Sequence, residues 1–264
     1  MELYFGGEAR SLYGVWHEPP RPPAPPRVLV LCAPLWREGV RAHRVLRQLA
    51  ARLAREGTTV LRFDYTGAGD SAGDNEAGDV ETWLGDVDAA VEEARGARGA
   101  ARVTLLGLRF GATLAALAAA RRDDVDRLVL WEPVPDGTSY LAEGRAEHRA
   151  WADLYAAWRR LPRRQVEDPG DEILGYRVTA AMRASISMVD LATLSRTARD
   201  VLVIERAAPD PGGGLPAVLA ARGARVLHEV LAEPEIWKPH HAEGTAGARR
   251  TQDLIAGWLA RSAS

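Results

Sequence analysis

The residue most open to chemical interpretation is Arg109, in the segment Gly107-Leu-Arg-Phe-Gly111. An apolar run typical of a buried strand (101–108) precedes it, and an alanine-rich stretch typical of a helix (112–121) follows it. A chain that passes this abruptly from strand to helix needs glycine where side chains would collide with neighbouring backbone. The spacing therefore predicts a sharp turn with a guanidinium group at its apex.

A guanidinium group stays protonated in proteins, so Arg109 cannot serve as a nucleophile. The backbone N–H groups of Phe110 and Gly111, at the start of a helix, would favour an anion, and Arg109 could bind a carboxylate or phosphate through two parallel hydrogen bonds. Alternatively, Arg109 pairs with a carboxylate of the chain itself, because a buried arginine needs a partner. Glu132 and Asp136, after the next strand, are the candidates for that pairing.

Strands and helices alternate along most of the sequence, which predicts an α/β protein with a mainly parallel central sheet flanked by helices. Residues 1–18 alternate apolar and polar around a glycine pair and predict a β-hairpin at the sheet edge. Residues 139–196 show helical periodicity and no strand, and we expect a helical cap insertion there, over a single domain of residues 1–264. Strands are expected at 27–34, 58–65, 101–108, 125–133, 199–206 and 225–231, and helices at 41–56, 79–96, 112–121, 215–222 and 246–261.

Composition excludes several classes of function. The formal net charge of -2 gives no excess positive field for nucleic acid or an anionic membrane. No apolar run approaches the roughly 20 residues that span a bilayer, and the N-terminus lacks the pattern of a signal peptide. The single cysteine, Cys32, excludes an internal disulfide and fits a cytoplasmic setting. Neither a cofactor nor a metal site is expected.

Three segments, in this order, resemble the α/β-hydrolase superfamily: VLVLCAPLWREG, LRFDYTGAGDSAGD and VTLLGLRFGATLA. The resemblance covers nearly the whole chain and implies the α/β-hydrolase fold. Within the superfamily, GLRFGATLA, LWEPVPDGTSYL and the later GYRVT–DL segment resemble hydrolase-like proteins that accompany bacterial exosortase A systems.

The resemblance makes the turn at Arg109 a nucleophile elbow, where the family's enzymes carry a serine. It also implies an oxyanion hole formed by the backbone N–H groups of Leu35 and Phe110. Trp36 beside that loop and Asp136 are expected to contact a substrate. In the segment FDYTGAGDS, Asp64 is expected to hold backbone N–H groups of its own loop.

The family's catalytic acid and histidine are expected after the last two strands. Asp210 is the best match for the acid, with Glu205 as a second choice. His240 and His241 both fall where the family's histidine lies, and either could activate a water molecule with the acid.

Three functions follow from these residues. The first is an enzyme without an elbow serine that acts on a small acyl, ester or carboxylate-bearing metabolite by water-activated hydrolysis, elimination or cyclisation. The second is a catalytically silent relative that binds a ligand or assists a biosynthetic system. The third is a hydrolase that uses Cys32 as nucleophile. A small-molecule substrate is the expected partner, with a second copy of the chain or a biosynthetic protein beside it.

Overall fold

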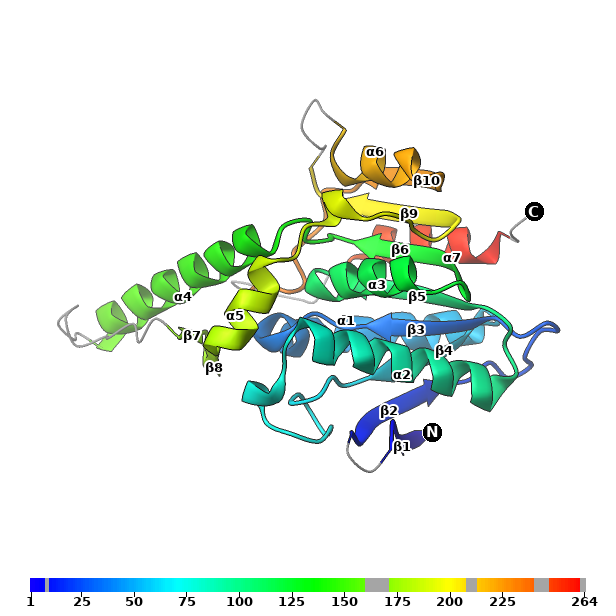
Figure 1. The fold of residues 1–264 in the computed structure, drawn as a ribbon, viewed down its shortest axis with the longest axis horizontal. Helices are drawn as coiled ribbons and strands as arrows, with labels where there is room; N and C mark the ends of the chain where they lie inside the picture. The colour runs from blue at the N-terminus through cyan, green and yellow to red at the C-terminus, as the bar shows by residue number, and fades with distance from the viewer. Residues whose placement is uncertain (8–9, 160–170, 208–212, 240–246, 262–264) are drawn as a thin grey trace.

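The computed structural model describes all of residues 1–264 except 8–9, 160–170, 208–212, 240–246 and 262–264. Eight strands form one sheet in the order β1-β2-β4-β3-β5-β6-β9-β10, parallel from β4 to β10 (Figure 1). The first two strands form the expected hairpin, and β2 joins β4 in antiparallel orientation. The strands are β1 (Glu2–Phe5), β2 (Leu12–His17), β3 (Val28–Cys32), β4 (Thr59–Phe63), β5 (Val103–Leu108), β6 (Val125–Trp131), β9 (Asp200–Glu205) and β10 (Arg225–Val230).

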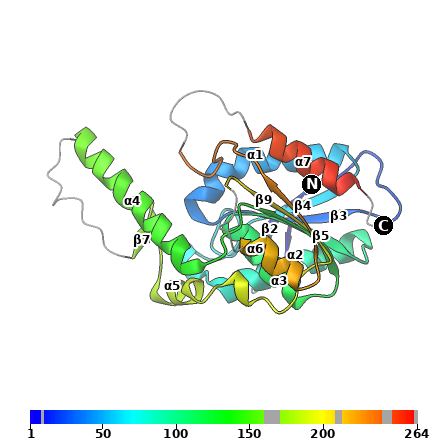
Figure 2. The same cartoon turned by 90° about the horizontal axis from the view of Figure 1, so that it is seen from above.

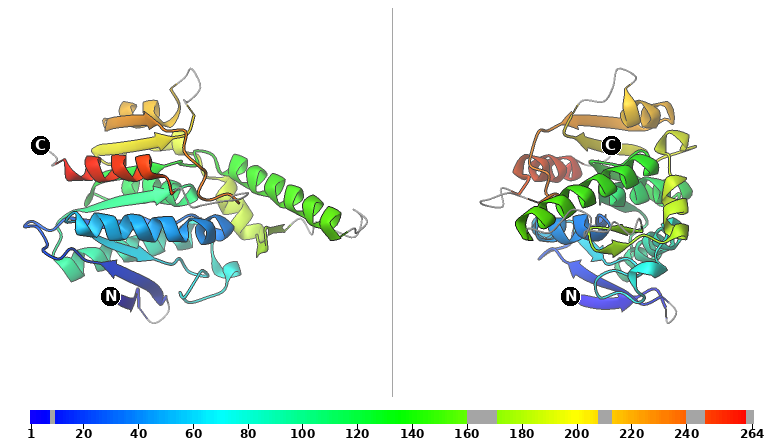
Figure 3. Two further views of the ribbon diagram at one scale, coloured as in Figure 1. Left: turned by 180° about the vertical axis from the view of Figure 1, so that it is seen from behind. Right: turned by 90° about the vertical axis from the view of Figure 1, so that its left-hand side faces the viewer.

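Helices cover both faces of the sheet. On one face lie α1 (Trp36–Arg55) and α7 (Arg249–Ala260); on the other lie α2 (Val80–Arg98), α3 (Phe110–Arg121) and α6 (Gly214–Ala221), as Figure 2 and the rear view in Figure 3 show. Successive residues of a strand point to opposite faces, so the apolar run of β3 serves two cores. Leu29 and Leu31 pack toward α1, whereas Val30 and Cys32 pack toward α2 and α3.

The cap extends from one end of the sheet (Figures 1 and 2). Its helices are α4 (Gly137–Arg159) and α5 (Ala180–Ser187). The expectation of a cap without strands is wrong, because β7 (Glu172–Ile173) and β8 (Tyr176–Arg177) form a short antiparallel hairpin. Strands of two residues are too short to show a period in the sequence. Two 3-10 turns, η1 (Asn75–Ala77) and η3 (Leu191–Thr193), complete the described elements.

No helix in the described part of the chain has the length and apolar character needed to cross a membrane.

Candidate functional site

The turn from β5 into α3 has the geometry that the glycine spacing predicts. Arg109 lies at its apex with φ 54° and ψ -127°, a strained backbone conformation for a residue with a side chain. A Cβ atom on Gly107 would lie 2.4 Å from the backbone N and Cα of Ala112, and one on Gly111 would lie 2.3 Å from the carbonyl oxygen of Ala33. The glycines therefore allow α3 to pack directly against the ends of β5 and β3.

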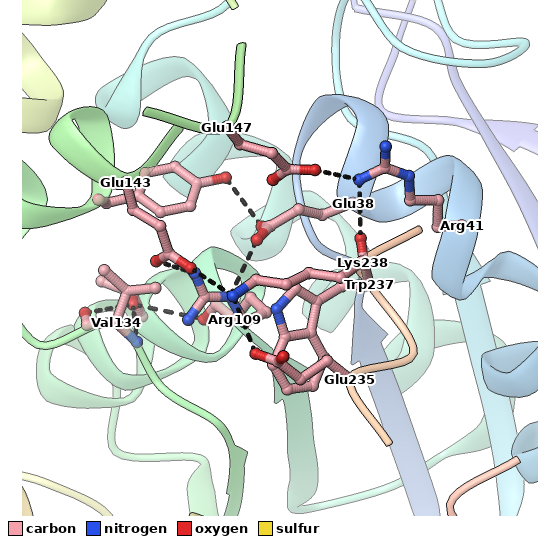
Figure 4. Close-up of polar contacts among 11 residues, drawn as sticks. Glu38, Arg41, Arg109, Val134, Glu143, Glu147, Glu235, Trp237 and Lys238 are labelled. Atoms are coloured by element: carbon pink, nitrogen blue, oxygen red, sulfur yellow. Dashed lines mark hydrogen bonds and ion pairs between the residues drawn. The ribbon is translucent and has the colours of Figure 1, made fainter. Parts of the chain in front are cut away.

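The side chain of Arg109 is bound by two carboxylates (Figure 4). Its Nε donates to Oε1 of Glu38 at 2.9 Å, and its Nη2 donates to Oε2 of Glu143 at 2.5 Å. Glu38 comes from the first turn of α1 and Glu143 from the cap helix α4. Only 11% of the arginine side chain and 14% of the Glu38 side chain are exposed, against 41% for Glu143. The arginine thus joins the cap to the body of the protein through one nearly buried ion pair, with Glu38, and one partly exposed pair, with Glu143.

Further polar contacts support both carboxylates. The Tyr140 hydroxyl donates to Oε2 of Glu38 at 3.0 Å. Nζ of Lys238 lies 3.3 Å from Oε1 of Glu143, the carboxylate oxygen that does not accept from Arg109. Burial raises the pKa of Glu38 even though Arg109 and Tyr140 lower it, whereas for Glu143 the pull of Arg109 and Lys238 outweighs burial and lowers the pKa. The pKa of Glu143 thus lies below its ordinary value, whereas Arg109 offsets only part of the effect of burial on the pKa of Glu38.

Aromatic rings close the space around the guanidinium group. Its central carbon lies 5.3 Å from the ring centroid of Trp237 and 5.8 Å from that of Tyr140. Tyr140 is itself stacked between Trp36 and Phe110, with centroid separations of 6.0 and 4.9 Å. The cavity that Leu35, Trp36 and Arg109 help to line has a volume of about 20 Å³, which leaves room for little more than one water molecule.

The structure brings together four of the residues predicted for the site: Arg109, Leu35, Trp36 and Phe110. Asp136 has another role, because its Oδ1 accepts the backbone N–H of Ser139 at 2.6 Å and caps the start of α4. The hydrogen-bonded partners of Arg109 are Glu38 and Glu143, so the expected pairing with Asp136 or Glu132 is wrong. Both expected partners follow β6 in the chain, but the arginine side chain reaches α1 and α4 instead. Asp210, His240 and His241 lie outside the described residues.

Two other predicted residues have clear structural roles. The carboxylate of Asp64 accepts the backbone N–H of Asp70 at 3.1 Å, which confirms that it holds its own loop. Glu205, the second choice for the acid, lies at the end of β9 and contacts Nε2 of His228 on β10 at 2.8 Å. Burial raises the pKa of Glu205 despite the nearby histidine.

Glu132, directly after β6, is a carboxyl group whose pKa burial moves close to neutrality. Its backbone has φ 47°, and burial raises its pKa to about 7, against the lowering effects of Arg109 and Arg206. It therefore exchanges a proton near physiological pH while standing close enough to Arg109 to sense that charge.

Cys32 does not have the setting of a nucleophile. Its side chain is fully buried and burial raises the pKa of its thiol to about 12, so almost none of it is thiolate at neutral pH. The burial of this thiol therefore argues against Cys32 as the nucleophile of a hydrolase.

We expect a maleimide reagent to leave the native protein unmodified and to modify one thiol after unfolding in urea. Intact mass spectrometry under both conditions measures this directly. Stoichiometric modification of the folded protein would contradict the buried position of Cys32.

The sequence analysis does not predict three residues that surround the Arg109 side chain: Glu38, Glu143 and Tyr140. A signal was present, because Tyr140, Glu143 and Glu147 recur at the spacing that places residues on one face of a helix. Glu147 accepts a hydrogen bond from Arg41 of α1 at 2.6 Å, and Tyr140 donates to Glu38 of α1, so this face of α4 contacts α1 at two points. Two carboxylates on one face of a predicted cap helix indicate that this face can form ion pairs with arginines of the protein body, as Glu143 and Glu147 do.

Comparison with solved structures finds close overall likeness at low sequence identity. Proline iminopeptidase of Mycobacterium smegmatis matches with a TM-score of 0.66 and 16% identity, over 98% of this chain and 97% of that one. The enol-lactonase of Burkholderia xenovorans matches with a TM-score of 0.59 and 18% identity, over 98% and 100% of the two chains. Est1E of Butyrivibrio proteoclasticus, solved with ferulic acid bound, gives a TM-score of 0.60 and 16% identity over 98% and 96%. These likenesses show the α/β-hydrolase fold.

A search of curated proteins finds no match. The family model described as Serine aminopeptidase, S33 matches residues 37–212, which include helix α1, the turn at Arg109 and the cap. That range is 176 of the 264 residues, two thirds of the chain. Together with the sheet order and the sharp turn after β5, this match shows that the chain belongs to the Serine aminopeptidase, S33 family of the α/β-hydrolase superfamily.

Proposed function

We propose that this hydrolase-fold protein performs no acyl-enzyme chemistry and serves as a ligand-binding or accessory protein in a biosynthetic system. One observation carries the proposal: the side chain at the apex of the elbow is a guanidinium group already bound to two carboxylates. Acyl transfer on this fold begins with attack by a nucleophile at that apex. Arginine has no electron pair to offer, and here its charge is also neutralised.

The closed form of the site supports the same conclusion. An oxyanion hole acts only when a substrate carbonyl can lie about 3 Å from its donors. The cavity of about 20 Å³ at Arg109 cannot hold an acyl group, because Tyr140 and the two glutamates occupy that space. Opening it would require Arg109 to leave Glu38, a nearly buried partner.

The finer assignment to the proteins of exosortase A systems rests on the segments GLRFGATLA and LWEPVPDGTSYL. It would place this chain in a bacterial biosynthetic system, and the single cysteine supports a cytoplasmic location.

A second candidate function is supported by Glu132. An enzyme lacking the serine could hydrolyse a small acyl or ester metabolite with an activated water molecule, or carry out an elimination or cyclisation. A carboxyl group with a pKa of about 7, beside Arg109, suits a general base. Asp210 with His240 or His241 would complete such a site, with Arg109 binding the carboxylate of the substrate.

Two assays separate these functions. We expect the native protein to hydrolyse p-nitrophenyl acetate no faster than the buffer does, and a fluorophosphonate probe to leave it unlabelled while labelling a serine esterase run in parallel. Labelling of the native protein would contradict the proposal outright. Turnover that disappears in Glu132→Gln would favour the second candidate, and turnover that persists in that variant would contradict both assignments.

A further inference from the structure

A larger cavity lies beside the closed elbow. Its volume is about 350 Å³, within the range of small-molecule sites, whereas the space at Arg109 is about 20 Å³. It is bounded by the loop that follows β3, by helix α1, by the loop that follows β4 and by the cap hairpin. Trp36 lines both cavities and so stands between them. We call the larger one the side cavity.

Apolar and aromatic groups form most of the wall of the side cavity. They come from β3, α1, β4, α2, the cap and the loops that follow β3 and β4. The members are Leu31, Leu35, Trp36, Val40, Leu46, Phe63, Tyr65, Trp83 and Tyr176. Aromatic rings provide large, rigid surfaces on which a planar molecule can stack. This wall therefore suits a flat apolar body rather than a flexible polar one.

Charged groups are few and nearly balanced. Arg62 and His43 contribute the basic side, and Asp64 and Asp70 the acidic side. Arg62 is already engaged, because its Nε donates to Nε2 of His17 at 3.0 Å. Asp64 uses Oδ2 for the backbone N–H of Asp70, which leaves its other carboxylate oxygen for a donor from a ligand. The charge of Arg62 is opposed by that of Asp64, and Asp70 adds a second carboxylate, so the side cavity has no excess of positive charge. This balance favours a neutral ligand with a hydroxyl or amino group over an anion.

The rim of the side cavity is held together by contacts between distant parts of the chain. Nδ2 of Asn75 donates to the carbonyl oxygen of Arg177 at 2.5 Å, and the Arg177 side chain pairs with Glu76 at 3.0 Å. These contacts place the adjacent Tyr176 over the loop after β4. The cap hairpin therefore supplies one wall of the side cavity in the described structure.

We propose that the side cavity is the ligand site of this protein, and that it binds a small planar aromatic molecule whose hydroxyl or amino group donates to Asp64. This proposal rests on the proposed function and adds to it the place and the chemical class of the ligand. It moves ligand recognition from the elbow, which Arg109 fills, to the adjacent space between α1 and the loop after β4.

Isothermal titration with 7-hydroxycoumarin tests the proposal, with coumarin as the matched compound that lacks the hydroxyl donor. We expect 7-hydroxycoumarin to bind one site, and coumarin to bind about tenfold more weakly or worse, because a hydrogen bond to a charged acceptor is lost. Asp64→Asn, which keeps an acceptor for Asp70 but removes the charge, should reduce the difference between the two compounds.

Val40→Trp supplies a steric test. Val40 is 62% exposed and lines the side cavity, so a larger ring there should obstruct ligand entry without disturbing the core. Arg55→Trp, at an exposed position near the end of the same helix, is the control. We expect Val40→Trp to lose binding at least tenfold and Arg55→Trp to bind as the native protein does.

The outcomes distinguish this inference from the function on which it rests. No heat with either compound, or equal binding in Val40→Trp and the native protein, would overturn the side cavity as the ligand site. Neither result would restore chemistry at the elbow. Ester hydrolysis by the native protein, in contrast, would overturn the proposed function while binding of 7-hydroxycoumarin could persist.

Discussion

Replacing Arg109 with methionine should lower the free energy of unfolding by about 3 kcal/mol at neutral pH, because removing one member of a buried ion pair leaves the other charge without compensation. The uncompensated charge is that of Glu38, because only 14% of its side chain is exposed. In the variant, the Tyr140 hydroxyl is the hydrogen-bond donor that Glu38 keeps. Glu143 is half-exposed and keeps Lys238. Methionine preserves most of the length of the arginine stem, so lost packing contributes little. Urea denaturation measures the change.

The matched control is Arg121→Met, at the other end of the same helix. Arg121 makes a two-pronged contact with Glu81, at 2.7 and 2.9 Å, but the side chains are 48% and 70% exposed. Exposed pairs contribute about 0–1 kcal/mol, so this variant should be close to the native protein. If burial rather than pairing decides the loss of stability, the free energy of unfolding will fall clearly more in Arg109→Met than in Arg121→Met.

The deficit of Arg109→Met should shrink as the pH falls. Burial raises the pKa of Glu38 above that of the unfolded chain, and removing Arg109 removes a group that lowers it. Between the unfolded and folded pKa values the folded state binds the extra proton, so stability falls as pH rises through this window. Below the unfolded value both states are protonated and the unpaired charge no longer exists.

Arg109→Met/Glu38→Gln should recover most of the lost stability at neutral pH, since no buried carboxylate is left unpaired and the amide oxygen can still accept from Tyr140. A double variant as unstable as Arg109→Met would show that the cost lies in packing around the guanidinium group. A pH-independent deficit in the single variant would point the same way.

The order of elements could be predicted from the sequence because each strand carries its own apolar run. Val28–Cys32 and Val103–Leu108 are covered on both faces of the sheet, and such strands are visible without knowledge of their neighbours. The turn at Arg109 was equally accessible, because the two glycines that permit it lie within two residues of its apex. Local sequence determines both features.

The ion pairs of the site were beyond local reasoning. Glu38 and Glu143 lie 71 and 34 positions from Arg109 along the chain, and the sequence gives no register between α1, α4 and the elbow. Asp136 lies close to the elbow in chain order, yet it caps the start of α4. The side cavity depends in the same way on a hairpin of two-residue strands that meets a loop 100 residues earlier.

The elbow should tolerate little change in its backbone packing, and we expect Gly107→Ala to destabilise the fold strongly. The added Cβ would lie 2.4 Å from three backbone atoms of residues 111 and 112, and backbone cannot rotate aside as a side chain can. Relief requires α3 to move away from β5, although α3 is buried against the sheet along most of its length. The expected loss is on the order of 4 kcal/mol.

Gly96→Ala provides the opposite case within the same protein. Gly96 is an exposed residue inside α2, and a Cβ built there meets nothing within 4 Å. Alanine at such a helical position should stabilise the fold by about 0.5–1 kcal/mol, because glycine loses more backbone freedom on folding. Thermal unfolding of both variants compares the two effects, with a fall of roughly 10 °C expected for Gly107→Ala. Near-native stability of Gly107→Ala would mean that α3 can shift, and that the close packing which fixes Arg109 at the apex is not required to hold it there.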